Sequence, residues 1–512
     1  MHWKTSATKA EGEIAKNLRS SSKFYRFLWS IRGELFDEAF QRRLMKAYAP
    51  RGQEPCPPAQ VAMATLLQRY AGLSDAAAVD AAENDKRWQL VLGTVGHRRA
   101  PFGQGSLVRY RARAIEHDLD RALLDRTIEL AKTTRRFGWK KLRVIFDSSP
   151  LEGAGRVEDT WNLIGRAMGK VVAAVGHATG TSPSSVVRGA GLTVLQADSV
   201  KAALDIDWSD TEQRHEALQL LLDEAARLES WERKEMKLDA ERPPVSEALD
   251  LLRQVVKQDL EPDPEGGGRR IRDGVAHDRV ISIGDTQMRH GRKSRSRTIN
   301  GYKRHIVTAN RFILGGVVEP ANRPEHAATG RLLTYARRHG RICCAHFDRG
   351  YLPAPEIAAL WKEGVELHSR AYRSASNGNF GKERFTILLK DRLVICPAGH
   401  LAQASPTTGQ AHFREQDCQA CPLKSSCTRA SHRSVTLHPN EDMLLHFRRE
   451  QASSHGRLTY RERTPVEHRL ARVDAIQGSK ARYVGVRKNE FDLCRTAALA
   501  NLQELARLRR AA

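Results

Sequence analysis

The sequence predicts an α/β core flanked by helices, combined with an N-terminal all-α domain, a helical insertion and a small cysteine-rich insertion. Three observations favour this fold class. Apolar runs at residues 144–146 and 342–347 each lead into an aspartate, as strands do at the ligand-binding edge of an α/β sheet. Long stretches outside these runs carry apolar residues at helical spacing. Four cysteines gather between residues 396 and 427.

Composition limits the class of protein. A length of 512 residues suggests roughly three domains, and 40% hydrophobic residues can form substantial cores. The formal net charge is +24, and basic residues recur along the whole chain, so the expected partner is a polyanion. There is no run of about 18 apolar residues, and the N-terminus lacks the apolar core of a signal peptide. We therefore expect a cytoplasmic protein without a membrane span.

The N-terminal part is predicted to be helical. Residues 1–23 are polar, and we expect them to be flexible. From Phe24 to about His117 apolar residues recur at helical spacing, with Gly72 as a break between two helices. The following amphipathic stretch, 106–136, is rich in arginine. Those arginines either solvate a helix face or contact DNA phosphates.

The segment RVIFDSSP, residues 143–150, contains the first core strand. We expect this strand to end at Asp147, because two serines and Pro150 follow. A charge at the end of a buried strand must be paired, solvated or bound to a cation. Asp147 is therefore a candidate metal ligand. The alternative is a turn residue that caps the next segment.

A helical insertion, from about residue 159 to 256, and the loop 261–270 separate Asp147 from the next strands. The run MRHGRKSRSRTINGYKRH, residues 288–305, is dense in positive charge and leads into a hairpin around Ala309 and Asn310. We interpret this run as a DNA-phosphate contact surface in preference to a solvated ribbon.

Two further acids, one at a strand end and one near a helix start, are candidate metal ligands beside Asp147. A helix at 326–339 precedes an apolar strand that delivers Asp348, and Gly350 lets the chain turn before the next helix. Glu467 lies in YRERTPVEHRLARVD, residues 460–474. There the alternative is a capping box formed by Thr464 and Glu467 at a helix start. Both interpretations can hold, since a carboxylate near a helix start can also face a metal.

Cysteine spacing indicates a metal site. Cys418 and Cys421 form a CxxC pair, and Cys427 and Cys396 supply two more thiolates. Four soft ligands suit tetrahedral zinc, with His400 as a substitute ligand. The alternatives are an iron–sulfur cluster or reduced cysteines without metal. We expect zinc to hold a small insertion together.

If Asp147, Asp348 and Glu467 converge, they form an oxygen-only site suited to Mg²⁺ or Mn²⁺. A pair of such ions roughly 4 Å apart can activate a water or a DNA 3′-hydroxyl and stabilise the leaving oxygen. Together with the positive charge, this site predicts phosphoryl transfer on nucleic acid.

Several motifs carry a resemblance over nearly the whole length: VIFDSSPLEGAGRVEDTWNL, RHGRKSRSRTINGYKRH, PANRPEH, HFDRGY, CPAGH with CQACP, YRERTPVEHR and RYVGVRKN. The chain resembles a bacterial insertion-sequence transposase of the DDE type, in the group numbered eleven-eighty-two. The family's terminal signature has a basic residue seven positions after the glutamate, where this chain has Asp474. Arg472 and Lys480 are candidate replacements.

The resemblance implies an RNase H-like catalytic core with a mixed sheet, in which Asp147, Asp348 and Glu467 hold magnesium. Arg463 would approach the scissile phosphate and Tyr460 a nearby base or sugar. The helical domain would recognise the inverted-repeat ends of double-stranded DNA, and a homodimer or larger synaptic complex would join them to target DNA in the bacterial nucleoid. The alternatives are a catalytically inactive, domesticated protein that occupies element ends and a nuclease that cuts without joining.

The predicted domains are a flexible N-terminus (1–23), a helical DNA-binding domain (24–136), the first core strand (137–154), a helical insertion and loop (155–270), the core sheet and helices with Asp348 (271–370), a cysteine-rich zinc-binding insertion (371–455) and C-terminal core helices with Glu467 (456–512). The predicted DNA contacts are Tyr460, Arg463, Arg292, Lys293, Arg295, Arg297, Lys303, Arg304, Arg487 and Lys488.

Overall fold

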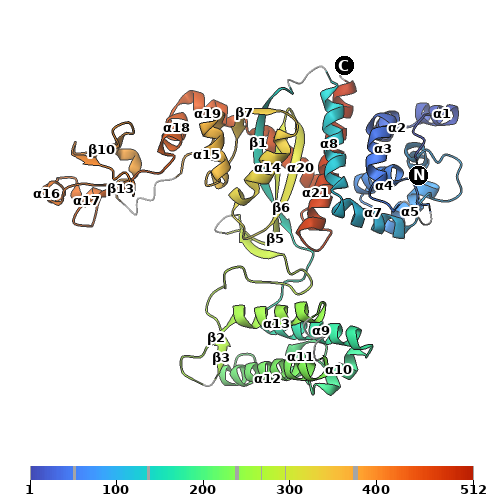
Figure 1. Ribbon diagram of the computed structural model, residues 1–512, viewed down its shortest axis with the longest axis horizontal. Helices are drawn as coiled ribbons and strands as arrows, with labels where there is room; N and C mark the ends of the chain where they lie inside the picture. The colour runs from blue at the N-terminus through green and yellow to red at the C-terminus, as the bar shows by residue number, and fades with distance from the viewer. Residues whose placement is uncertain are drawn as a thin grey trace.

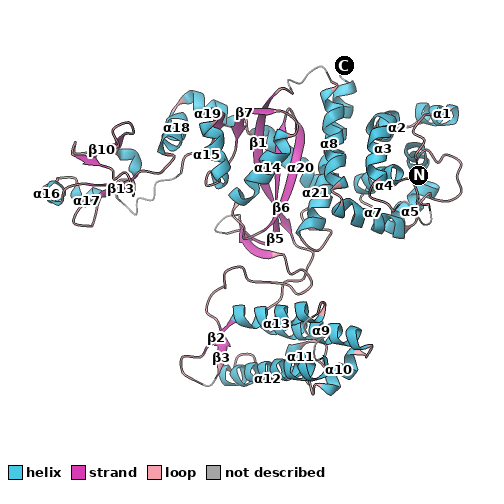
Figure 2. Cartoon of the chain, viewed as in Figure 1, coloured by secondary structure: helices cyan, strands magenta, loops and turns pink. Residues whose placement is uncertain are grey.

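The computed structural model describes residues 2–49, 54–134, 139–236, 242–266, 268–293, 296–372 and 379–510. A central sheet with flanking helices forms the middle of the molecule (Figure 1). The N-terminal helices lie on one side of it, a second group of helices lies below it in this view, and a small cysteine-rich region extends from the opposite side. Most of the strand structure belongs to the central body (Figure 2).

The central sheet has six strands: β1 (Lys141–Glu152), β4 (Arg289–Arg292), β5 (Thr298–Ala309), β6 (Phe312–Pro320), β7 (Arg341–His346) and β8 (Glu366–His368). The order is β4-β5-β1-β7-β8, and β6 also pairs with β5. β7 runs parallel to β1 and β8, whereas the pairs β1–β5, β4–β5 and β5–β6 are antiparallel. The predicted α/β core with a mixed sheet is therefore present.

The prediction that the first core strand ends at Asp147 is wrong. β1 continues to Glu152, and Pro150 lies within it. Pairing with β7 stops at Ile145, whereas pairing with β5 continues to the end of the strand. Beyond Ile145, therefore, one side of β1 has no neighbouring strand among the described residues. A strand tolerates the missing N–H of proline at such an edge, so Pro150 can lie within β1.

The hairpin predicted around Ala309 and Asn310 is confirmed. β5 and β6 pair up to Ala309 and Phe312. Asn310 and Arg311 make the turn with positive φ angles of 49° and 72°. This is the left-handed conformation that a two-residue hairpin loop requires.

Helices cover the sheet. They are α8 (Leu119–Lys132), η3 (Glu325–Ala328), α14 (Thr329–Arg337), η4 (Arg349–Tyr351), α15 (Pro355–Lys362), α20 (Thr464–Gln477) and α21 (Val486–Arg510). α14 and α21 pack on β6, and α20 packs on β1. The predicted order of helix, strand and helix around Asp348 is confirmed by α14, β7 and α15.

The N-terminal helices are α1 (Lys9–Asn17), η1 (Ser20–Ser22), α2 (Lys23–Leu35), α3 (Glu38–Met45), α4 (Pro58–Ala71), α5 (Asp75–Asn84), α6 (Lys86–Leu92) and α7 (Gln104–Glu116). The prediction of a flexible segment up to residue 23 is wrong for the described residues. Thr8 and Glu11 form a capping box at α1, and Glu11 makes a buried ion pair of 2.7 Å with Arg32. Trp3 is also buried. One continuous hydrophobic core joins these helices to the sheet.

The chain between β1 and β4 forms helices with a separate hydrophobic core. They are α9 (Thr160–Thr179), α10 (Pro183–Gly189), α11 (Val200–Leu204), α12 (Thr211–Met236) and α13 (Val245–Asp259), followed by the hairpin of β2 (Leu260–Pro262) and β3 (Arg269–Ile271). None of the helices among the described residues combines the length and apolar character needed to cross a membrane.

The cysteine-rich region has a third, smaller core. Its elements are η5 (Lys382–Arg384), β9 (Thr386–Leu388), β10 (Leu393–Ile395), β11 (Leu401–Gln403), β12 (Gln410–His412), α16 (Glu415–Gln419), α17 (Lys424–Cys427) and β13 (Ser434–Thr436). The helices α18 (Glu441–Ala452) and α19 (Ser454–Arg461) then lead the chain back to α20.

Candidate active site

Three acidic side chains converge on one arginine at the edge of the central sheet. Asp147 lies in β1, Asp348 follows β7 by two residues, and Glu467 lies in the first turn of α20. The guanidinium of Arg463 is 3.0 Å from the carboxylate of Asp147, 3.5 Å from that of Asp348 and 3.9 Å from that of Glu467. The parallel pairing of β1 with β7 and the packing of α20 on β1 bring these residues together.

Asp147 is the most buried of the three, with 8% of the residue exposed. Its Oδ1 accepts a hydrogen bond of 2.8 Å from the backbone N–H of Ser148. Burial raises the pKa of the Asp147 carboxyl; Arg463 opposes this effect, and the neighbouring charge of Asp348 adds to it, so that the pKa stays above its usual range. A buried carboxylate of this kind favours a nearby cation.

Asp348 is held by its own backbone. Its Oδ1 accepts a hydrogen bond of 2.8 Å from the N–H of Arg349, so the Asp348 side chain caps η4. This side chain is 45% exposed. A Cβ at Gly350 would overlap the carboxylate of Glu325, so a larger residue here would force that side chain to move. Gly350 lies within η4 and has no positive φ angle, so the predicted turn does not depend on a backbone conformation that only glycine adopts.

The carboxylate of Glu467 is not used for a capping box. α20 begins at Thr464, and its N-cap, Arg463, makes no side-chain capping hydrogen bond. Pro465 lies in the first turn, where its missing N–H costs no intrahelical hydrogen bond. The capping interpretation of Thr464 is therefore wrong, and the side chain of Glu467, which is 61% exposed, faces Arg463.

The acids line a cavity of about 600 Å³ together with basic side chains from the β4–β5 region. Arg292, Lys293 and Lys303, all predicted from the sequence, lie on its wall. Glu325 also lines it, and its Oε1 accepts a hydrogen bond of 2.6 Å from Ser148. Glu325 is not among the residues predicted from the sequence, although it lies in the PANRPEH motif. Oxygen ligands and cations therefore share one cavity.

Arg304 was predicted to contact DNA, and the structure contradicts this. Its side chain is 1% exposed and donates to Ser149 Oγ at 2.9 Å and to Gln477 Oε1 at 2.8 Å. It also pairs with Asp474 at 2.5 Å. Asp474, which stands where the family signature has a basic residue, is therefore paired with Arg304 of β5. Neither of the proposed replacements lines the cavity of the three acids; Arg472 instead donates to Gln503.

The remaining predicted contacts have varied positions. Arg487 pairs with Asp118 and Asp120, which gives it a structural role in the described fold. Lys488 and Arg297 are exposed. Arg295 lies outside the described residues.

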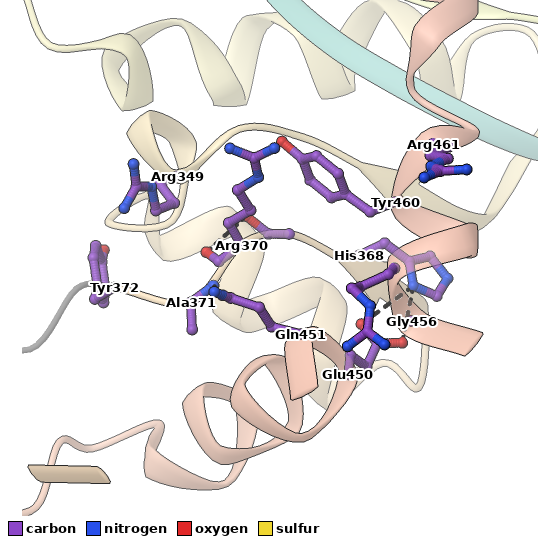
Figure 3. A pocket seen from close by; sticks show the side chains of 12 residues that line it. Arg349, His368, Arg370, Ala371, Tyr372, Glu450, Gln451, Gly456, Tyr460 and Arg461 are labelled. Carbon is purple, nitrogen blue, oxygen red and sulfur yellow. Dashed lines mark hydrogen bonds and ion pairs between the residues drawn. The ribbon is translucent and has the colours of Figure 1, made fainter. Parts of the chain in front are cut away.

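A second cavity, of about 510 Å³, is lined by Tyr460 and by residues of β8 and α19 (Figure 3). Its wall includes Arg349, Arg370, Arg457 and Arg461. The Arg370 guanidinium lies 4.7 Å from the centre of the Tyr460 ring, and the Tyr460 hydroxyl accepts a hydrogen bond of 2.9 Å from Arg463. Tyr460 therefore connects this arginine-rich surface to the arginine between the acids.

The four clustered cysteines line one small cavity with His400. Burial raises the pKa of the Cys427 thiol, Arg433 opposes this, and the nearby thiols Cys418, Cys396 and Cys421 raise the pKa further. A cation would relieve this repulsion, so the donor set fits zinc. A different set of potential metal ligands lies closer together among the described residues. It consists of Cys344, His346 and His368, on β7 and β8, whose ligand atoms all lie within 4.8 Å of one another.

Two family models match the chain. The model described as Transposase DDE domain matches residues 395–506, and that described as Transposase domain (DUF772) matches residues 16–113. The first range contains Tyr460, Arg463 and Glu467, and the second covers most of the N-terminal helices. No curated protein and no solved structure matches the chain.

Proposed function

We propose that this chain, which belongs to the DDE transposases of insertion sequences, catalyses metal-dependent cleavage and strand transfer at the inverted ends of its element. The observation that carries the proposal is the convergence of Asp147, Asp348 and Glu467 in one cavity beside basic side chains. The mixed sheet supports an RNase H-like catalytic core. On the motifs quoted above, we also propose the eleven-eighty-two group.

The three carboxylates would hold Mg²⁺ or Mn²⁺. The oxygen-only donor set fits these hard cations, and the contacts of all three acids with one guanidinium support a site that attracts positive charge. When bound, a pair of such ions supplies activation of a water or a DNA 3′-hydroxyl and stabilises the leaving oxygen.

The other side chains in the proposal bind and orient DNA. Arg463 would contact the scissile phosphate, and Tyr460, which holds the guanidinium of Arg463, would contact a nearby base or sugar. Lys303 lines the cavity, so we propose it as the basic group in place of the one missing at Asp474. The exposed Arg292 and Lys293, which line the same cavity, would bind the phosphate backbone of the DNA. A homodimer or larger synaptic complex would bring the two ends together.

The proposed function is tested on DNA taken from the genomic sequence on either side of the reading frame. DNA that carries the element's inverted repeats is labelled and incubated with the protein and a target plasmid, in Mg²⁺ or in EDTA. Joined products that form in Mg²⁺ but not in EDTA support transposition. Cleavage without joining would instead assign a nuclease, and a mobility shift without either would assign an inactive DNA-binding protein.

We expect DNA binding to depend strongly on salt. The logarithm of the binding constant should fall by about 0.9 per phosphate contacted for each tenfold rise in salt. The double variant Arg292→Ala, Lys293→Ala should therefore lower the slope by about 2. Fluorescence anisotropy with end DNA at several salt concentrations measures this slope. The matched control is Arg337→Ala, since Arg337 is half exposed but pairs with Glu363. An equal change of the salt-dependence slope in both variants would show that Arg292 and Lys293 do not contact DNA.

A further inference from the structure

We propose that Cys344, His346 and His368 form a buried zinc site on the central sheet, separate from both the carboxylate cavity and the cysteine-rich region. Cys344 and His346 are two residues apart in β7, so their side chains share one face. In the register of the sheet, His368 of β8 lies directly opposite His346. The strand pairing therefore places a thiol and two imidazoles side by side.

The distances suit tetrahedral zinc. Cys344 Sγ lies 3.3 Å from His346 Nε2, and potential ligand atoms of all three residues lie within 4.8 Å of one another. Zinc bonds of about 2.3 Å to sulfur and 2.0 Å to nitrogen place neighbouring ligand atoms roughly 3.5 Å apart in a tetrahedron. A small adjustment of side chains completes this geometry. Thiolate and imidazole ligands select zinc over magnesium.

Carboxylates surround the three side chains and can complete the site. Glu462 Oε2 lies 3.7 Å from His346 Nε2, and Glu366 Oε1 lies 2.9 Å from His368 Nε2, so either can supply the fourth ligand. Glu450 contacts the opposite nitrogen, Nδ1, of His368 at 3.0 Å (Figure 3). This is the carboxylate–histidine arrangement that orients a metal-binding imidazole.

Burial and charge favour a cation at this position. Cys344 is 0%, His346 2% and His368 4% exposed. Zn²⁺ with one thiolate and one carboxylate is electrically neutral, so the complete site can be buried without a net charge.

The competing occupant is a proton on His368. Burial lowers the pKa of His368, but hydrogen bonds with Cys344 and Glu450 and the charge of Glu450 outweigh this effect and raise it to about 10. Without metal, an imidazolium would balance the carboxylates. The experiment must therefore distinguish a bound zinc from a bound proton.

The position of the site indicates a supporting role for the catalytic cavity. His346 precedes Asp348 by two residues, and Glu462 immediately precedes Arg463. A zinc ion bound by β7, β8 and the end of α19 would fix these segments relative to one another. The zinc would contribute to folding and would not touch the DNA.

Zinc content of the purified full chain tests the proposal. The starting protein carries Cys396→Ser, Cys418→Ser, Cys421→Ser and Cys427→Ser, because these changes remove all four thiolates of the cysteine-rich region. Adding Cys344→Ala should lower bound zinc by about one equivalent per chain, measured by mass spectrometry of the metal after dialysis. The matched control is Cys343→Ala on the same strand, whose Sγ donates to the Leu142 carbonyl at 3.4 Å. We expect the control to keep its zinc.

Cobalt substitution gives a second readout that does not depend on that variant. The starting protein with Co²⁺ should show thiolate-to-cobalt charge transfer and tetrahedral d–d absorption. Cys344→His should keep the tetrahedral absorption but lose the charge-transfer band. Absence of the charge-transfer band in the starting protein, or equal zinc in the Cys344→Ala and Cys343→Ala variants, would overturn the proposal and assign the cluster to a protonated His368.

Discussion

The substitution Asp348→Asn is expected to abolish strand cleavage and to leave DNA binding nearly intact. Asparagine keeps the size of aspartate and an oxygen that can accept the hydrogen bond from the Arg349 N–H, so η4 keeps its cap. It removes the negative charge that would hold a divalent cation. Metal-based stabilisation of a phosphoryl-transfer transition state is worth several kcal/mol. A loss of about 4 kcal/mol corresponds to a rate reduced about a thousandfold.

The measurement is single-turnover cleavage of labelled end DNA in Mg²⁺, with binding followed by anisotropy in the same samples. The matched control is Asp273→Asn, the same chemical change at a side chain that is 94% exposed in the loop after β3. The control should cleave at the rate of the unaltered protein. A variant at Asp348 that still cleaves at a comparable rate would refute the assignment of the acids.

The largest loss of stability is expected from Arg304→Met. The guanidinium donates to Ser149, Gln477 and two backbone carbonyls and pairs with Asp474. Methionine fills much of the same space but leaves these acceptors without a donor. Removing one member of a buried charged network costs about 3–5 kcal/mol. Urea denaturation followed by tryptophan fluorescence measures this change in the free energy of unfolding.

The control is Asp474→Asn. Because the side chain of Asp474 is 45% exposed and asparagine keeps an oxygen that can accept from Arg304, this change should cost less than Arg304→Met does. Equal stabilities of the Arg304→Met and Asp474→Asn variants would contradict the structural role of Arg304. They would return this side chain to the set of candidate DNA contacts.

Local sequence patterns predicted the elements around Asp348 well. An apolar strand, an acid, a glycine and a helix follow one another within about twenty residues, so the prediction needed no long-range information. The hairpin at Asn310 was also predictable, because its turn chemistry is local. The length of β1 was not. Whether Pro150 can lie in a strand depends on where β7 ends, which is a property of the folded sheet.

Charge was the least reliable guide to the site. Arg304 lies in a basic run, and the sequence gives no sign that its side chain is buried, where it pairs with Asp474 and donates a hydrogen bond to Gln477. Its neighbour Lys303 lines the cavity instead. Glu325 was missed because its partner, Ser148, lies 177 residues away along the chain.

The Cys344, His346 and His368 cluster illustrates the same limit. The pair CxH in β7 is too short to predict a metal site, because its third member comes from the neighbouring strand. Only the register of the parallel strands places His368 opposite His346. In contrast, the four clustered cysteines were identified by spacing alone.

The most direct test of the central claim is an anomalous difference map from crystals of the protein bound to end DNA in Mn²⁺. We predict two manganese peaks about 4 Å apart, contacted by the carboxylates of Asp147, Asp348 and Glu467. Arg463 should then contact a DNA phosphate and no longer all three acids. Manganese bound elsewhere, with Arg463 still paired to the three carboxylates in the DNA complex, would contradict a metal-dependent active site at this position.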